Sequence, residues 1–222
     1  MKKLKIIGVL VFFMLTTGLF AQTVQPAFWD EIQSFKKQDS INFPAKNQIL
    51  FVGSSSLRMW TDIRNYFPGY KIINRGFGGS SLQDVIRYAD DIILPYKPTQ
   101  IFIYCGENDL AAFDTVTAQL VFMRFKELFA LIRKNLPQTP ILFISIKPSP
   151  SRKNLMSKMV ATNEMIKKFL KKKSKTGFVD VYHKMLKADG TPMDDIFKED
   201  KLHMTAKGYA IWQKAIKPYL LK

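Results

Sequence analysis

Five short apolar runs recur along the chain with little polar alternation inside them. They are rich in β-branched and aromatic residues and occupy residues 49–52, 71–73, 101–105, 141–146 and 178–181. A strand with one solvated face would alternate between apolar and polar residues, whereas a strand of a parallel sheet is covered on both faces. The runs therefore predict five buried, parallel strands.

Longer stretches with apolar residues at helical spacing lie before and between these runs. They predict helices over residues 28–38, 81–94, 116–135, 154–173 and 206–220, with Thr205 as the N-cap of the last one. Strands that alternate with helices indicate a doubly wound α/β sandwich. No internal repeat or linker divides the pattern, so we expect one domain over residues 22–222.

The first 21 residues have the pattern of a secretory signal peptide. Three lysines stand within the first five residues, an apolar stretch follows over residues 6–20, and Ala21 is a small residue suited to cleavage. The apolar stretch is shorter than the roughly 20 residues of a spanning helix. We therefore expect cleavage after Ala21 and a secreted or periplasmic protein without a stable membrane span. An uncleaved anchor is the alternative.

Composition narrows the class of protein further. With 222 residues, 47% of them hydrophobic, the chain can bury a core and is not a wholly disordered protein. Cys105 is the single cysteine, so no internal disulfide forms, and two histidines make a multi-histidine metal site unexpected. We expect neither a metal nor another cofactor.

The chain is strongly basic, with 34 Lys and Arg against 18 Asp and Glu, a net charge of +16. Removal of the first 21 residues takes three lysines and leaves +13. This charge suits anionic surfaces, but the spread of the lysines favours solvated faces. Six lysines within residues 167–175 fit a solvated helix end. Nucleic acid is not an expected partner, since no recognition motif is present, and the oligomeric state stays open.

Residues that could take part in catalysis or binding follow three of the predicted strands, and a further group precedes the last predicted helix. In an open α/β sheet, ligands bind beyond the carboxyl ends of the strands. The segments at those positions are Gly53–Ser56, Asn74–Gly79 and Gly106–Asp109, and Asp200–His203 lies before the last helix. Each segment alone is unspecific, because glycine and serine after a strand often form only a turn and a lone histidine is more often structural.

Taken in this order, the four segments resemble the sequence blocks of the SGNH, or GDSL-like, hydrolases. The first block reads Ile-Leu-Phe-Val-Gly-Ser-Ser-Ser-Leu over Ile49–Leu57, and the others read Asn-Arg-Gly-Phe-Gly-Gly, Gly-Glu-Asn-Asp and Asp-Lys-Leu-His. The resemblance covers nearly all of the chain after residue 21 and is closest to the branch of platelet-activating-factor acetylhydrolase-like esterases. It implies a three-layer α/β/α sandwich with a mainly five-stranded parallel sheet, as in flavodoxin-like folds, and it implies ester hydrolysis.

The resemblance also implies a role for individual residues. Ser55 matches the nucleophile, His203 the base that takes its proton, and Asp200 the acid that holds the imidazole tautomer. The oxyanion of the tetrahedral intermediate would be stabilised by the backbone N–H groups of Ser55 and Gly79 and by the side-chain amide of Asn108. Such donors are effective because they are in place before charge develops.

One position departs from the family pattern. Ser54 stands where the family has the aspartate of Gly-Asp-Ser-Leu, so three consecutive serines follow Gly53. Counting from the glycine assigns the nucleophile to Ser55 and leaves Ser54 and Ser56 as loop residues. The chain lacks a Gly-x-Ser-x-Gly elbow, which disfavours a standard α/β-hydrolase.

Other polar residues near the strand ends receive simpler interpretations. Glu107 and Asp109 are expected at the surface or in local hydrogen bonds, and His183 is expected to be a non-catalytic residue without a matched partner. Residues 147–150 are candidates to shape a pocket. Arg152 is a candidate to contact an anionic substrate.

The sequence thus favours a secreted serine esterase that removes a short acyl group, with acetyl expected, from a carbohydrate or lipid alcohol. A non-catalytic α/β domain that binds an anionic ligand is the alternative. A metal-dependent phosphoesterase is a third possibility that lacks an obvious ligand cluster.

Overall fold

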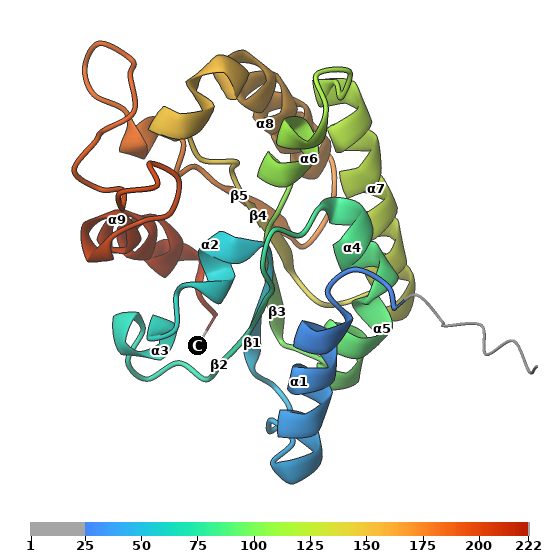
Figure 1. Cartoon of the computed structure of the whole chain (residues 1–222). Helices are drawn as coiled ribbons and strands as arrows, with labels where there is room; N and C mark the ends of the chain where they lie inside the picture. The colour runs from blue at the N-terminus through green and yellow to red at the C-terminus, as the bar shows by residue number, and fades with distance from the viewer. Residues whose placement is uncertain (1–24, 222) are drawn as a thin grey trace, which may run out of the picture.

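A computed structural model describes residues 25–221 of the chain. The predicted signal peptide, residues 1–21, lies outside the described residues and stays a prediction. The described part forms one five-stranded, all-parallel sheet in the order β2-β1-β3-β4-β5 (Figure 1). The strands are β1 (Ile49–Gly53), β2 (Ile72–Gly76), β3 (Gln100–Tyr104), β4 (Ile141–Ile144) and β5 (Thr176–Val179). The predicted α/β fold with five parallel strands is confirmed.

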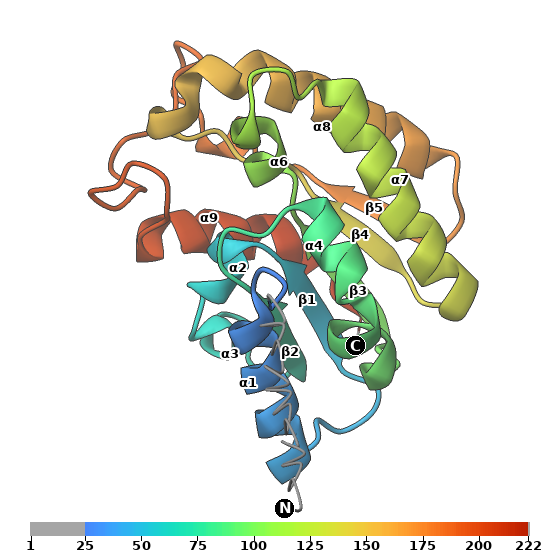
Figure 2. The ribbon, with the colours of Figure 1, turned by 45° about the vertical axis from the view of Figure 1, so that its right-hand side comes forward.

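Helices cover both faces of the sheet, and Figure 2 shows α7 and α8 on one side of it and α9 on the other. The first face packs against α1 (Trp29–Ile41), α4 (Leu82–Arg87), α5 (Ala89–Ile92), α7 (Ala118–Asn135) and α8 (Met156–Lys171). The second face packs against α2 (Ser55–Arg58), α3 (Ile63–Tyr66) and α9 (Ala206–Ile216). A further short helix, α6 (Glu107–Ala112), follows β3. The three layers are those of an α/β/α sandwich.

Alternate residues of each central strand enter the two cores. In β1, Leu50 and Val52 belong to the core under α7 and α8, whereas Ile49 and Phe51 belong to the core under α9. Successive side chains of a strand point to opposite faces. Because both faces are buried, every residue of β1 and β3 is buried, which explains their continuous apolar sequence.

The predicted helix over residues 81–94 is wrong as one element. Ser81 and Asp84 form a capping box at the start of α4, but the chain leaves helical geometry at Tyr88 and resumes as α5. The Tyr88 hydroxyl donates a hydrogen bond to the carbonyl of Ala27 at 2.7 Å, which ties this break to the residues just before α1. Pro95 then lies in a 3-10 turn over Leu94–Tyr96.

The last predicted helix is also shorter than expected. It ends at Ile216, and Pro218 continues the chain as a 3-10 turn over Lys217–Tyr219. Thr205 does occupy the N-cap position, but its side chain makes no capping hydrogen bond, and its buried hydroxyl has no hydrogen-bond partner among the described residues. The helix start is thus correct although the predicted capping contact is not made.

We expect Gly53→Ala to destabilise the protein by more than about 2 kcal/mol. Gly53 ends β1 with φ +143°, and a Cβ there would lie 1.8 Å from the carbonyl oxygen of Tyr104 in β3. Gly69→Ala is the matched control, since Gly69 also has positive φ but no atom within 4 Å, and should cost only about 1 kcal/mol. Urea unfolding measures both; equal losses would contradict the clash.

Candidate active site

Ser55 lies at the first residue of α2, directly after the carboxyl end of β1. The preceding residue is anchored across the sheet, because the N–H of Ser54 donates to the carbonyl of Tyr104 at 3.0 Å. β1 lies between β2 and β3, with Gly53 in register with Gly76 and Tyr104. The segments that follow these three neighbouring strands therefore start from the same edge of the sheet.

A continuous chain of hydrogen bonds joins Ser55, His203 and Asp200. The Nε2 atom of His203 lies 2.9 Å from the Ser55 hydroxyl, although the two residues are 148 positions apart. The Nδ1 atom of His203 lies 2.6 Å from Oδ2 of Asp200. The side chain of His203 is 19% exposed and that of Asp200 is 46% exposed. The arrangement can move a proton from the hydroxyl to the imidazole while the carboxylate fixes the ring.

Asp200 is held as a carboxylate by its own loop. Burial alone would raise its pKa, but hydrogen bonds from the His203 ring and from the backbone N–H groups of His203 and Leu202 outweigh it and lower the pKa to about 2. These N–H groups reach Oδ1 of Asp200 at 2.8 and 2.9 Å. One carboxylate oxygen therefore organises the loop, and the other accepts from the imidazole.

The loop with His203 is fixed to the rest of the site by α9 and a short antiparallel bridge. Phe197 pairs with Met204, and the N–H of Lys198 donates to the carbonyl of His203 at 2.7 Å. Tyr209 of α9 donates through its hydroxyl to the carbonyl of Ser56 at 2.8 Å. This bond joins α9 to α2 one residue after Ser55, so the base and the hydroxyl are positioned together.

The three consecutive serines differ in their surroundings. Ser54 and Ser56 are each only 2% exposed, whereas Ser55 is partly exposed and is the one that the imidazole of His203 contacts. The geometry thus favours Ser55 over its neighbours as the hydroxyl that His203 can deprotonate.

Gly79 and Asn108 belong to the loops that follow β2 and β3. Gly79 has φ +65°, a backbone geometry that glycine adopts at little cost. The Asn108 side chain donates to the carbonyl of Ser80 at 3.1 Å, so the two loops touch next to Gly79. The backbone N–H of Gly78 donates to the carboxylate of Glu31 in α1, which also pairs with Arg58 at 3.1 Å.

The acidic neighbours of Asn108 are not surface residues, contrary to one of the expectations for them. Asp109 is fully buried and accepts from the N–H of Leu82 at 2.9 Å and from Arg124 at 2.8 Å. Burial raises the pKa of Asp109, and these donors offset part of the rise. Glu107 is buried against Lys147. Lys147 directly follows the apolar run of residues 141–146, but this position does not indicate its partner, which lies 40 residues earlier.

His183 has a matched partner, which corrects the sequence interpretation. Its Nδ1 atom lies 2.7 Å from Oδ2 of Asp180, and its N–H donates to Oδ1 of Asp180, which repeats the Asp200 and His203 geometry. The His183 side chain is 64% exposed and follows β5 at the edge of the sheet. An Asp-x-x-His pair is therefore a local turn motif in this fold.

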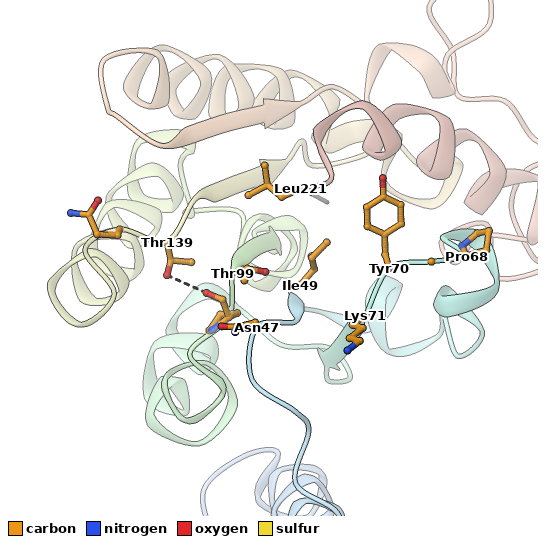
Figure 3. A pocket seen from close by; sticks show the side chains of 11 residues that line it. Asn47, Ile49, Pro68, Tyr70, Lys71, Thr99, Thr139 and Leu221 are labelled. Carbon is orange, nitrogen blue, oxygen red and sulfur yellow. Dashed lines mark hydrogen bonds between the residues drawn. The ribbon is translucent and has the colours of Figure 1, made fainter.

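A cavity of about 950 Å³ lies at the amino ends of the strands, at the end of the sheet opposite to Ser55 (Figure 3). Ile49 at the start of β1, Lys71 before β2 and Thr99 before β3 line it, together with Tyr70 and Leu221. These residues mark the amino ends of the strands, whereas Ser55 follows the carboxyl end of β1. The cavity is therefore separate from the hydrogen-bonded site.

Among residues 25–221, neither a metal-ligand cluster nor a membrane-spanning helix is present. In this range no three His, Cys, Asp or Glu side chains gather closely enough to hold a metal ion. Nor does any helix there have the length and apolar character to cross a membrane.

Sequence comparison matches residues 52–211 to the model of the GDSL-like lipase/acylhydrolase family. No curated protein sequence matches the chain. Similar solved structures include a Streptococcus pneumoniae protein named for platelet activating factor, with 21% identity and a TM-score of 0.76 over 86% of this chain and 92% of that one. A GDSL-like lipase from Bacteroides thetaiotaomicron has 20% identity and a TM-score of 0.72 over 85% and 96%. An acetylxylan esterase from Geobacillus stearothermophilus has 14% identity and a TM-score of 0.62 over 81% and 96%.

Proposed function

The chain belongs to the GDSL-like lipase/acylhydrolase family and is an ester hydrolase, and from this premise we propose that it is a serine esterase with Ser55 as nucleophile. The observation that carries the proposal is the hydrogen-bond chain from Ser55 through His203 to Asp200, with distances of 2.9 and 2.6 Å. A purely ligand-binding domain would not need a hydroxyl, an imidazole and a carboxylate in this order.

The proposed reaction proceeds in two halves. His203 takes the proton of the Ser55 hydroxyl while the oxygen attacks the ester carbonyl carbon, and the carbonyl electron pair moves to oxygen. The intermediate collapses, the bond to the alcohol oxygen breaks, and His203 returns the proton to that leaving group. A water molecule then gives a proton to His203 as its oxygen attacks the acyl carbon. The bond from that carbon to Oγ of Ser55 breaks, His203 returns the proton to Ser55, and the acid is released. Asp200 stabilises the imidazolium in both halves.

The developing oxyanion is proposed to bind to three donors. They are the backbone N–H groups of Ser55 and Gly79 and the side-chain amide of Asn108. All three belong to segments that follow neighbouring strands, and the contact between Asn108 and Ser80 links two of these segments. The sheet edge thereby supplies donors that need no rearrangement when charge develops.

The proposed substrate is a short-chain ester, with an acetyl group on a carbohydrate or lipid alcohol. Support comes from the fold that the chain shares with a protein named for platelet activating factor and with an acetylxylan esterase. We further propose that the enzyme acts as a single domain over residues 22–222, outside the cytoplasm, after cleavage at Ala21. The signal-like pattern of residues 1–21 supports this location.

Labelling with a fluorophosphonate, followed by peptide mapping, tests the proposal. We expect one label, on Ser55, and hydrolysis of 4-nitrophenyl acetate by the protein that begins at Gln22. A parallel assay of acetylated xylo-oligosaccharides and of an acetylated phospholipid would then distinguish the two substrate classes. A label on another residue would refute the assignment of Ser55. The absence of both labelling and hydrolysis of acetyl and butyryl esters would refute the proposed activity.

Asn108→Ala should lower kcat by about 10²–10³-fold, the usual effect of removing one oxyanion donor. The loss falls on kcat because the donor acts on charge that exists mainly in the transition state. Steady-state kinetics with 4-nitrophenyl acetate would measure it. Asn135→Ala, at the exposed end of α7, is the control and should leave kcat unchanged. A decrease of less than about fivefold would show that Asn108 is not a donor.

The pH profile of kcat/KM should have an acidic limb with a slope of one. His203 must be neutral to accept the serine proton, whereas Asp200, whose pKa is lowered to about 2, stays ionised. Because the pKa of Asp200 is lowered in the folded state, its ionisation stabilises the native state above the unfolded value of about 4, and this contribution is lost only as the pH falls below that value. The loss of this contribution therefore does not set the limb. Initial rates measured between about pH 5 and 8 test this. A flat profile would contradict histidine as the base.

A further inference from the structure

A buried ionic cluster lies directly behind Asn108. Lys147, after β4, donates to both oxygens of the Glu107 carboxylate at 3.0 and 3.2 Å. Tyr104 and Ser149 donate their hydroxyls to the same carboxylate at 2.6 and 3.3 Å. Arg152 approaches it at 3.7 Å from the segment after Ser149. The loops after β3 and β4 are thus joined through one carboxylate, which we call the Glu107 cluster, comprising Tyr104, Glu107, Lys147, Ser149 and Arg152.

Burial of charged side chains is costly, and pairing and hydrogen bonds offset only part of this cost. The side chain of Lys147 is 0% exposed and that of Glu107 is 4% exposed. Buried ion pairs often contribute little or nothing to stability compared with apolar residues of similar size, because desolvation offsets the attraction. Stability alone is therefore a weak explanation for this cluster. The cluster also contains two cations for one carboxylate, which leaves a positive excess beside the proposed oxyanion site.

Arg152 connects the Glu107 cluster to the Asn108 amide. Its Nη2 atom donates to Oδ1 of Asn108 at 3.0 Å. Its Nη1 atom lies 3.7 Å from Oε1 of Glu107, which is an ion pair without a hydrogen bond, since this buried Nη1 atom has no hydrogen-bond partner among the described residues. Nδ2 of Asn108 has two hydrogens, and the bond to Ser80 uses one of them. The other hydrogen is available to an oxyanion. Arg152 binds Oδ1 and Ser80 binds Nδ2, so the amide cannot flip and its N–H groups stay on the side of Ser80.

We propose that Arg152 is a positioning residue that orients and polarises the Asn108 amide for oxyanion binding, and that the Glu107 carboxylate holds Arg152 in place. This inference rests on the proposed esterase function. A charged donor at Oδ1 draws electron density from the amide and strengthens its N–H donors, since hydrogen bonds in series polarise one another.

A double-mutant cycle with a neutral ester, 4-nitrophenyl acetate, tests the proposal. Arg152→Met should lower kcat about 10- to 100-fold, as for groups that act through a reacting side chain, with KM nearly unchanged. In the Asn108→Ala background, Arg152→Met should have almost no further effect, because the group through which it acts is gone. Losses that multiply in the double variant would overturn the proposal, and so would unchanged activity of Arg152→Met.

Control variants separate positioning from charge and from folding. Lys153→Ala removes an exposed cation from the adjacent position and should leave kcat unchanged. Arg152→Lys keeps the charge, but one ammonium group lacks the planar fork that joins Glu107 to Asn108, so it should remain impaired. Thermal unfolding of each variant shows whether it is folded. If Arg152→Met does not fold, the cycle is run with Arg152→Lys.

The same data distinguish the possible failures. If Asn108→Ala itself retains full activity, the oxyanion site of the proposed function is wrong. If Asn108→Ala is impaired but Arg152→Met is not, only the role of Arg152 fails. A parallel assay with an ester that carries a negative charge tests the remaining alternative. An impairment of Arg152→Met that is confined to this ester, and to KM, would overturn the proposal and show that Arg152 contacts the substrate directly.

Discussion

Ser55→Ala is expected to reduce kcat at least about 10⁴-fold and to abolish fluorophosphonate labelling. The methyl group cannot attack a carbonyl, so no acyl-enzyme forms and only direct attack by water on the bound ester remains. Some catalysis above the uncatalysed rate should persist, because the oxyanion donors and the bound substrate stay in place. Single-turnover and steady-state rates with 4-nitrophenyl acetate would measure the loss.

The neighbouring serine provides the matched control for Ser55. Ser54→Ala removes a hydroxyl one position away, from a side chain that is 2% exposed, and should retain most of the activity. A large loss in Ser54→Ala together with a small loss in Ser55→Ala would reverse the assignment that counting from Gly53 suggests. Equal losses in both variants would indicate damage to the loop after β1 and not the removal of a nucleophile.

Asp200→Asn should lower kcat by about 10⁴-fold while leaving the fold intact. The carboxylate accepts a hydrogen bond from Nδ1–H of His203 and so favours the tautomer in which Nε2 is free to accept the proton of Ser55. An asparagine amide can donate to Nδ1 and so stabilise the opposite tautomer, in which Nε2 carries the proton and cannot act as a base. Steady-state kinetics, together with the rate of fluorophosphonate labelling, should both show the loss.

The chain offers a control with nearly the same geometry as Asp200. Asp180→Asn changes the carboxylate that accepts from His183 at 2.7 Å in the second Asp-x-x-His pair, after β5. It should leave kcat unchanged, since His183 is not part of the proposed machinery. If both aspartate variants lose activity equally, the effect of Asp200→Asn reflects general charge loss and the tautomer argument is wrong.

The sequence predicts the strands well because their signal is local. Each central strand is buried on both faces, so its apolar run is continuous and carries most of the information about its position. The helix break at Tyr88 has no such local signal, because the hydroxyl bond to Ala27 that accompanies it joins residues 61 positions apart. The end of the last helix does have a local signal in Pro218, but the apolar pattern continues past this proline to Leu220 and made the predicted helix too long.

In the site, too, residues within short sequence motifs could be predicted, whereas contacts between distant residues could not. The four sequence blocks identify Ser55, Asn108 and His203 as candidates through a family resemblance. The burial of Glu107 against Lys147 could not be predicted, because the partners are 40 residues apart and lie on different loops. Charged residues after strands are usually solvated, so the default expectation fails where two such loops are packed together.

The order in which the site is assembled follows from the place of α9. All five strands are complete at Val179, yet the imidazole arrives only at His203, and the tyrosine bond from α9 to α2 comes later still. A ribosome releases the chain from its N-terminus onward. In the proposed mechanism, a nascent chain therefore has Ser55 and all five strands before it has His203. It would gain the ability to cleave esters only after roughly its last tenth has been made and has docked.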